Sequence, residues 1–120
     1  MWKVKRTLLE DAGQAARNFY PKEFMCFLGG DKKKEIIEEI VFLPTENSQN
    51  SASVNEQSIP FDETIIGSLH SHPSGNNLPS RQDKKFFLKY QINAIMSYPY
   101  TPEGVAFYDK NGEKITVLLL

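Results

Sequence analysis

The first regular pattern along the chain is a series of apolar residues at the three- and four-residue spacing of a helix. The series comprises Leu8, Leu9, Ala12, Ala15, Ala16 and Phe19. It predicts an amphipathic helix from Thr7 to Phe19. Thr7 is the expected N-cap, with Glu10 three residues on as in a capping box. Tyr20-Pro21 is expected to end this helix, because the residue before a proline is disfavoured in helical conformation.

Short apolar runs predict strands in most of the remaining chain. Phe24–Leu28 and Ile36–Leu43 are expected to form a hairpin that turns at Gly29-Gly30-Asp31. Further strands are expected at residues 64–71, 93–97, 104–108 and 114–120, and a second helix from Ser80 to about Gln91. An Asn-Gly turn signal at Asp109–Gly112 separates the last two strands.

No internal repeat or linker interrupts this succession of strands and helices. It predicts a single domain over residues 1–120 of the α/β or α+β class, with one mixed β-sheet flanked by helices. The segment from Glu46 to Gln57 is rich in Asn, Ser and Gln. It predicts a polar loop with a short edge strand near Ala52 to Val54.

Composition narrows the class of protein. The hydrophobic content of 40% and the charged content of 24% are those of an ordinary globular protein. A formal net charge of −1 provides no basic field, so we expect no nucleic-acid partner. The single cysteine excludes an internal disulfide. The charged segment Met1–Arg6 does not resemble a signal peptide, and no apolar run is long enough to cross a bilayer. We therefore expect a cytoplasmic protein without a membrane partner.

The strongest chemical signal is His70-Ser71-His72-Pro73, followed by Ser80 and Asp83. Side chains two apart on a strand point to the same face, so the two histidines can approach one metal ion. Asp83 could add a carboxylate oxygen. Three protein ligands leave the fourth tetrahedral position of zinc open, as in catalytic zinc sites.

Simpler interpretations exist for the same residues. Two histidines at this spacing also arise by chance on an ordinary strand. Ser80-Arg81-Gln82-Asp83 fits a helix cap, with Ser80 as N-cap and Asp83 at the third helical position. The cap and the metal site are compatible, because a residue in the first turn of a helix is rigidly held.

The motif resembles the signature of the JAMM (MPN-plus) metalloprotease family. That signature is His-x-His-Pro, a six-residue spacer and Ser-x-x-Asp, with a glutamate well upstream. Residues 74–79 give the spacer here the family length. The order of expected helices and strands resembles that of the family along nearly the whole chain. The resemblance implies a curved sheet between helices, related to the cytidine deaminase fold, and the size is that of the minimal prokaryotic, archaeal-like members.

The resemblance also implies a role for each site residue. His70, His72 and Asp83 match the Zn²⁺ ligands, and Ser80 matches the residue that steadies the oxyanion of the tetrahedral intermediate. Glu23 stands where the family keeps its general acid/base. The residues alone favour a simpler interpretation, in which Glu23 is an exposed glutamate at the start of a strand, and only the resemblance indicates the catalytic role.

The implied activity is that of a zinc metallo-isopeptidase, a hydrolase. Its expected partner is a ubiquitin-like modifier or its protein conjugate, cleaved at the C-terminal tail of the modifier. On this view the polar segment Asn50 to Asn55 adds a strand beside the extended tail. Two alternatives remain open at this point: a metal-free interaction scaffold of the wider family, and an enzyme that processes a small sulfur-carrier protein.

Other chemistries fit the residues less well. Cys26 lies in an apolar run and would need an activating histidine to act as a nucleophile. A nucleobase deaminase would need His-x-Glu and Cys-x-x-Cys, and the sequence contains neither. Tyr98-Pro99-Tyr100-Thr101-Pro102 is most simply a rigid turn after a core strand, and a contact with a peptide substrate is the second interpretation.

Overall fold

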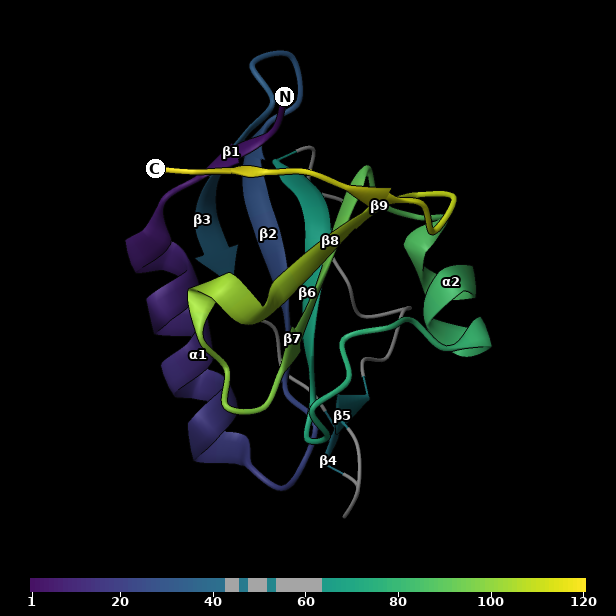
Figure 1. Ribbon diagram of the computed structural model, residues 1–120. Coiled ribbons are helices and arrows are strands. Elements are labelled where there is room, and N and C mark those ends of the chain that lie inside the picture. The colour runs from purple at the N-terminus through teal and green to yellow at the C-terminus, as the bar shows by residue number, and fades with distance from the viewer. Residues whose placement is uncertain (43–45, 48–51, 54–63) are drawn as a thin grey trace.

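A computed structural model describes residues 1–42, 46–47, 52–53 and 64–120, and Figure 1 shows their arrangement. The helices are α1 (Arg6–Phe19), α2 (Arg81–Phe87) and a short 3₁₀ helix, η2 (Pro102–Gly104). The strands are β1 (Lys3–Val4), β2 (Met25–Asp31), β3 (Ile36–Val41), β4 (Glu46–Asn47), β5 (Ala52–Ser53), β6 (Ile65–His72), β7 (Ile92–Ser97), β8 (Val105–Asp109), β9 (Lys114–Ile115) and β10 (Leu118–Leu119).

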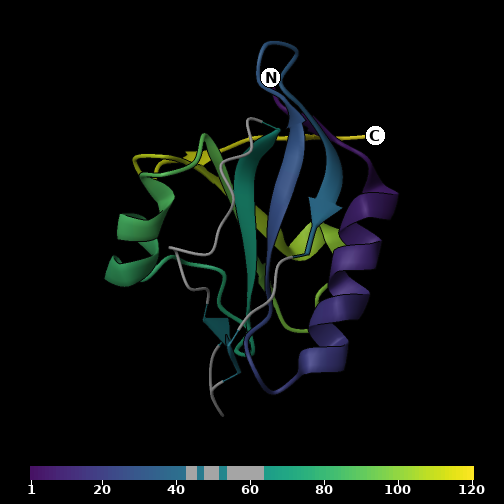
Figure 2. The same cartoon turned by 180° about the vertical axis from the view of Figure 1, so that it is seen from behind.

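Eight of these strands form one mixed sheet in the order β10-β1-β3-β2-β6-β7-β8-β9. β2 is antiparallel to both β3 and β6, whereas β6 and β7 run parallel and are joined through α2. Helix α1 lies on one side of the sheet and α2 on the other (Figures 1 and 2). The expected α+β architecture, a mixed sheet flanked by helices, is therefore confirmed.

Alternation along the strands divides the interior into two cores. The larger core faces α1 and includes Cys26, Leu28, Leu69, Ala94 and Met96 together with Leu9, Ala12 and Ala16 of the helix. The smaller core faces α2 and consists of Phe87, Ile95, Ala106 and Tyr108, with Phe86 packed against it. Side chains at alternate positions of the central strands thus meet different helices, as a two-residue period requires.

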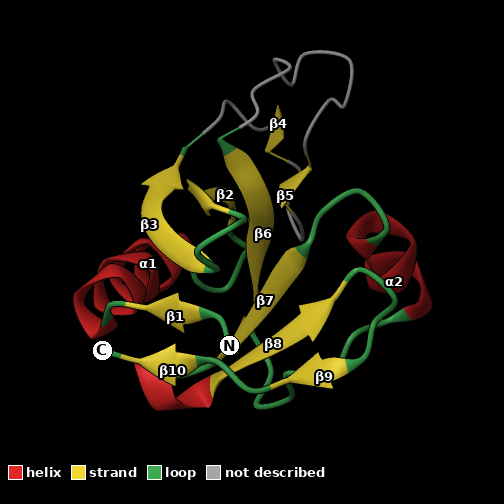
Figure 3. Cartoon of the chain, turned by 90° about the horizontal axis from the view of Figure 1, so that it is seen from above, coloured by secondary structure: helices red, strands yellow, loops and turns green. Residues whose placement is uncertain are grey.

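The last residues of the chain bond to both margins of the sheet. β9 pairs with β8 at one margin, and β10 pairs with β1 at the other. Only Thr116 and Val117 separate these two short strands. Figure 3 shows the resulting curl, with the C-terminal segment running from β9 across to β10. The sheet closes almost completely on itself as a result.

The structure corrects several expected boundaries. The N-cap of α1 is Lys5 rather than Thr7, because the backbone N–H groups of Leu8 and Leu9 already bond to the Lys5 carbonyl. Residues 114–120 form two strands rather than one, because the sheet curls between them. α2 ends at Phe87, earlier than expected. The Asn93 side-chain amide, which donates to the carbonyls of Phe87 and Tyr90, accounts for this end.

The expected turn at Gly29-Gly30-Asp31 is also wrong. All three residues belong to β2, and the pairing with β3 shifts register between Gly29 and Gly30. A Cβ on Gly30 would lie 2.1 Å from the carbonyl oxygen of Ile36, so glycine is needed for this close approach. The chain turns at residues 32–35 instead, where the Asp31 carboxylate accepts two backbone hydrogen bonds.

The polar segment is described only in part. Ala52 and Ser53 form β5, which pairs with β4, whereas Val54 and most of the expected strand from Asn50 to Asn55 lie outside the described residues. None of the described helices is long and apolar enough to span a membrane.

Candidate metal centre

The two histidines lie at the end of β6, in the middle of the sheet. His70 pairs with Met25 of β2 and Ile95 of β7, and His72 pairs with Ser97. Because they are two residues apart, both imidazoles point to the α2 side of the sheet. His70 is buried against Phe87 of that helix, and His72 is partly exposed.

Three side chains converge on one point beside this strand end. The Nε2 atoms of His70 and His72 are 3.2 Å apart. Of the two Asp83 oxygens, Oδ1 lies 3.3 Å from Nε2 of His70 and Oδ2 lies 3.3 Å from Nε2 of His72. Three ligand atoms about 2.0–2.1 Å from one tetrahedral zinc ion are about 3.3 Å apart. The separations of 3.2 and 3.3 Å match this value, so the side chains of His70, His72 and Asp83, referred to below as the metal cluster, are spaced as the ligands of one zinc ion would be.

Hydrogen bonding determines which nitrogen of His72 faces His70 and Asp83. Its Nδ1 lies 2.9 Å from the carbonyl oxygen of Asn76. A carbonyl only accepts hydrogen bonds, so Nδ1 carries the proton and the lone pair of Nε2 is free for a metal. The sequence motif does not identify Asn76 as part of the site, because its contribution comes from the backbone.

The carboxylate and the imidazole perturb each other without a metal. Hydrogen bonding to Asp83 raises the pKa of His72, although burial opposes the shift, and the Asn76 carbonyl and the charges of Asp83 and Glu23 add to it. Burial alone would raise the pKa of Asp83, but hydrogen bonds to His70 and His72 hold it well below its usual range. The site thus favours an ionised Asp83 carboxylate beside a protonated His72 imidazole.

Asp83 is held by the start of α2. The Ser80 hydroxyl accepts a hydrogen bond from the Asp83 backbone N–H at 3.0 Å, and the Ser80 backbone N–H donates to the Asp83 carboxylate at 2.8 Å. This is the expected capping box. The cap and the metal cluster coexist, because the same carboxylate that receives the Ser80 N–H also faces His72.

Glu23 lies two residues before Met25, the first residue of β2. Phe24 and Cys26 face the α1 core, so the alternation places Glu23 on the other side, with the histidines. Met25, two residues later, pairs with His70, so Glu23 lies at the end of β6 that carries the metal cluster, and its charge adds to the raised pKa of His72. The neighbouring residue is anchored to the motif strand, because the Phe24 N–H donates to the Ser71 hydroxyl at 2.7 Å.

Ser71 is a residue whose part in the site the sequence analysis missed. It lies between the two histidines and points to the opposite face of β6. A buried hydroxyl on a core strand needs a partner, and that signal could have identified it.

The spacer between the histidines and Asp83 is also tied down. The Asn77 amide donates to the Gly104 carbonyl at 3.1 Å, and the Tyr108 hydroxyl donates to the Asn77 carbonyl at 2.8 Å. These bonds connect the spacer to the last residue of η2 and to the penultimate residue of β8. The spacer is therefore fixed although it contains small, polar residues.

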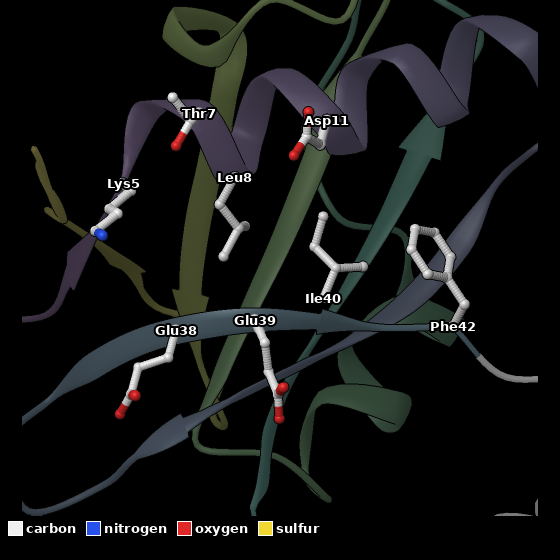
Figure 4. Close-up of a pocket in the computed structure, with 8 residues that line it drawn as sticks. All are labelled: Lys5, Thr7, Leu8, Asp11, Glu38, Glu39, Ile40 and Phe42. Atoms are coloured by element: carbon white, nitrogen blue, oxygen red, sulfur yellow. The ribbon is translucent and has the colours of Figure 1, made fainter.

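Two other features lie apart from the cluster. Burial raises the pKa of Cys26 to about 12, and this thiol faces α1 rather than the histidines, so it does not serve as a nucleophile. A groove of about 360 Å³ lies between α1 and β3 (Figure 4). It is lined by Lys5, Thr7, Leu8, Asp11, Glu38, Glu39, Ile40 and Phe42. None of these belongs to the metal cluster.

The sequence profile of a family described as prokaryotic homologs of the JAB domain matches residues 5–109. A probable metalloprotease of Haloferax volcanii is 29% identical in an alignment of 114 residues that covers 88% of this chain and 71% of that protein.

Solved structures agree with that match. A JAB1/MPN domain protein from Archaeoglobus fulgidus has a TM-score of 0.78 and 28% identity, with 98% of each chain covered. A structure described as a JAMM metalloprotease-like zinc site in the proteasome and signalosome has a TM-score of 0.78 and 27% identity, covering 100% of this chain and 98% of that one. A protein of Desulfitobacterium hafniense, 20% identical with a TM-score of 0.71 over 100% of this chain and 93% of its own, shares the fold.

Proposed function

This chain belongs to the family of prokaryotic homologs of the JAB domain, and we propose that it is a zinc-dependent metalloprotease of the JAMM type. We further propose that it hydrolyses isopeptide or peptide bonds after the C-terminal tail of a ubiquitin-like protein. The relatives described as a probable metalloprotease and as a metalloprotease-like zinc site support the reaction class.

The observation that carries the proposal is the triangle of ligand atoms. His70, His72 and Asp83 place two nitrogens and a carboxylate within 4.8 Å of one another. Asn76 holds His72 in the tautomer that binds metal, and Ser80 holds the carboxylate. A tetrahedral ion held by these three residues keeps one position open for water or substrate.

A zinc ion at this site would act as a Lewis acid toward the substrate carbonyl and lower the pKa of water to about 7. Glu23 accepts the proton that the attacking water loses. As the carbonyl carbon gains the water oxygen and the C–N bond breaks, Glu23 returns the proton to the leaving amine. The Ser80 hydroxyl donates to the oxyanion, since its oxygen accepts from the Asp83 N–H and its own proton is available.

The polar segment after β3 is the proposed binding site for the substrate tail. The extended tail would add as a strand beside residues 50–55, and the β5 strand at Ala52–Ser53 supports this role. Val54→Pro should weaken tail binding and leave zinc content unchanged. Unchanged binding in this variant would contradict strand addition there.

The first experiment measures the metal content of the purified protein by elemental mass spectrometry. We expect about one zinc per chain in the native protein and a large loss in His72→Ala, because two protein ligands bind zinc far more weakly than three. Absence of zinc after resupply would instead favour an interaction scaffold.

The second experiment separates chemistry from metal binding. Glu23→Gln should retain zinc and lose hydrolysis, because glutamine cannot transfer the proton. Assays with conjugates of a ubiquitin-like protein and with a small sulfur-carrier fusion would then distinguish the two enzymatic alternatives. Normal cleavage by Glu23→Gln would refute the acid/base role.

A further inference from the structure

Two tyrosines form an exposed aromatic surface at the same end of the sheet as the metal cluster. The rings of Tyr20 and Tyr98 have centroids 4.9 Å apart, and the two residues are 48% and 50% exposed. Tyr100 is fully buried behind them and packs edge-on against both rings. We refer to Tyr20 and Tyr98 as the exposed tyrosine pair.

Hydrogen bonds to His72, Ser74 and Arg17 hold the backbone of residues 98–100, beneath this pair, in place. The Tyr98 N–H donates to the carbonyls of His72 and Ser74, each at 3.2 Å. The Arg17 guanidinium of α1 donates to the carbonyls of Pro99 and Tyr100, also at 3.2 Å.

Two further features show that this turn is closely fitted to α1. Tyr100 has a φ of 68°, a left-handed conformation that is uncommon for a bulky residue. Gly13 of α1 permits the close approach, because a Cβ there would lie 2.3 Å from the Tyr100 carbonyl oxygen. A surface that is ordered before binding loses little conformational entropy when a partner binds.

The exposed tyrosine pair lies on the Glu23 side of the metal cluster. Tyr20 is three residues before Glu23, and Tyr98 is hydrogen-bonded to the backbone of the ligand His72. Met25 pairs with His70 and Ser97 pairs with His72, so Glu23, just before β2, and Tyr98, just after β7, flank the same end of β6. In Figure 1 the loop after β7 turns toward the C-terminal end of α1, whereas β4, β5 and α2 lie across β6.

The positions of β5 and Glu23 indicate where the tail of the substrate and its leaving half would lie. The proposed site for the ubiquitin-like tail is on the β5 side, and Glu23 delivers a proton to the leaving amine. The leaving half of the substrate must therefore extend past Glu23, away from β5. The exposed tyrosine pair is the aromatic surface in that direction.

We propose that Tyr20 and Tyr98 bind the polypeptide that carries the leaving amine, namely the acceptor lysine and its flanking residues. This inference rests on the proposed function. Aromatic faces suit the aliphatic stem of a lysine and any neighbouring apolar or proline side chain, and phenol groups can bond to the peptide backbone. Tyrosine is enriched in protein interfaces for these reasons. Because Tyr100 already provides the packing, the exposed faces of the pair are available to a ligand.

The test compares two substrates that share a tail and differ in the leaving group. One has the tail joined to the lysine of a ten-residue peptide, and the other ends in a methylamide. Tyr20→Ala and Tyr98→Ala should each raise KM for the lysine-linked substrate about tenfold. KM for the methylamide should stay unchanged, because its leaving group does not reach the pair.

A second readout does not depend on turnover. An uncleavable analogue of the lysine-linked substrate, titrated calorimetrically into the zinc-free protein, should bind about tenfold more weakly to each alanine variant. Tyr98→Phe should restore most of the affinity, since the aromatic face is retained. Leu118→Ala is the matched control, because Leu118 is 45% exposed on β10, at the other end of the sheet.

The outcomes separate this inference from the function on which it rests. If the native protein cleaves both substrates and the tyrosine variants affect neither, or affect both equally, the inference is wrong and the proposed function stands. If the native protein cleaves neither substrate when loaded with zinc, the proposed function fails and the inference fails with it. Thermal unfolding of each variant checks that the fold is retained.

Discussion

Replacement of Ser71 by alanine should expose how the site depends on one buried hydrogen bond. The Ser71 hydroxyl accepts from the Phe24 N–H at 2.7 Å, and the two residues are joined a second time by the bond from the Ser71 N–H to the Phe24 carbonyl. Phe24 is only 5% exposed. In Ser71→Ala the Phe24 N–H therefore loses its acceptor in a place that water does not readily reach.

The size of the effect follows from this burial. An unsatisfied buried donor costs about 1–3 kcal/mol of unfolding free energy. For a chain of 120 residues the unfolding entropy is about 0.25 kcal/mol per degree. The melting temperature of Ser71→Ala should therefore fall by about 4–12 °C. Hydrolysis should slow as well, because Phe24 is adjacent to Glu23 and its anchoring fixes where Glu23 enters the site.

Thermal unfolding followed by circular dichroism, with zinc content measured alongside, tests this reasoning. Ser74→Ala is the matched control, because Ser74 is exposed and accepts only a 3.4 Å bond from the Asn76 N–H. Its melting temperature should change by less than about 2 °C. If Ser71→Ala melts within the range of that control, the hydrogen bond does not anchor the start of β2 and the reasoning is refuted.

Zinc affinity should fall as the pH is lowered from about 8 to about 5, and the loss should begin at a higher pH than an ordinary histidine would give, because Asp83 raises the pKa of His72. In the metal-free protein the same pKa shift makes the free energy of unfolding larger at low pH, because charged His72 stabilises the fold. This contribution disappears as the pH rises through the raised pKa. Zinc titration against a competing chelator measures the first effect, and a flat profile would contradict it. Asn93→Ala should lower the unfolding free energy by about 2–4 kcal/mol and weaken zinc binding. The buried Asn93 amide donates to the carbonyl of Phe87, the last residue of the helix that carries Asp83, and to that of Tyr90 just beyond it. Urea unfolding that matches the native protein would contradict this prediction.

The elements with strong periodicity could be predicted from the sequence, and their ends could not. The helix spacing of Leu8, Ala12 and Phe19 identified α1, whereas its first residue depended on backbone bonds to Lys5. The two-residue strand β1 has no local pattern, because it forms only where residues distant in sequence pair with it. The sequence at Gly29 and Gly30 predicts a turn, because their close packing against β3 depends on the register between the two strands, which the sequence does not provide.

The metal cluster was accessible from the sequence because its spacing carries the geometry. His70 and His72 share a face through strand alternation, and the capping pattern fixes Asp83 relative to Ser80. The place of Glu23 depends on the register between β2 and β6, where Met25 pairs with His70. That register is a tertiary property, so only the family resemblance could indicate Glu23 in advance.

The closure of the sheet by the C-terminal segment has a kinetic consequence. Lys3 pairs with Leu118, more than a hundred residues away in the sequence, and the Arg6 N–H donates to the carbonyl of Leu120. Contacts of such long range require nearly the whole chain to be ordered before they contribute any free energy, and they make folding slow. We therefore expect the union of the first and last strands to be a late step in folding, after the hairpin of β2 and β3 and the parallel pair β6 and β7. Until that step the margin of the sheet at β1 stays unpaired, and the incompletely folded chain is open to association with other strands.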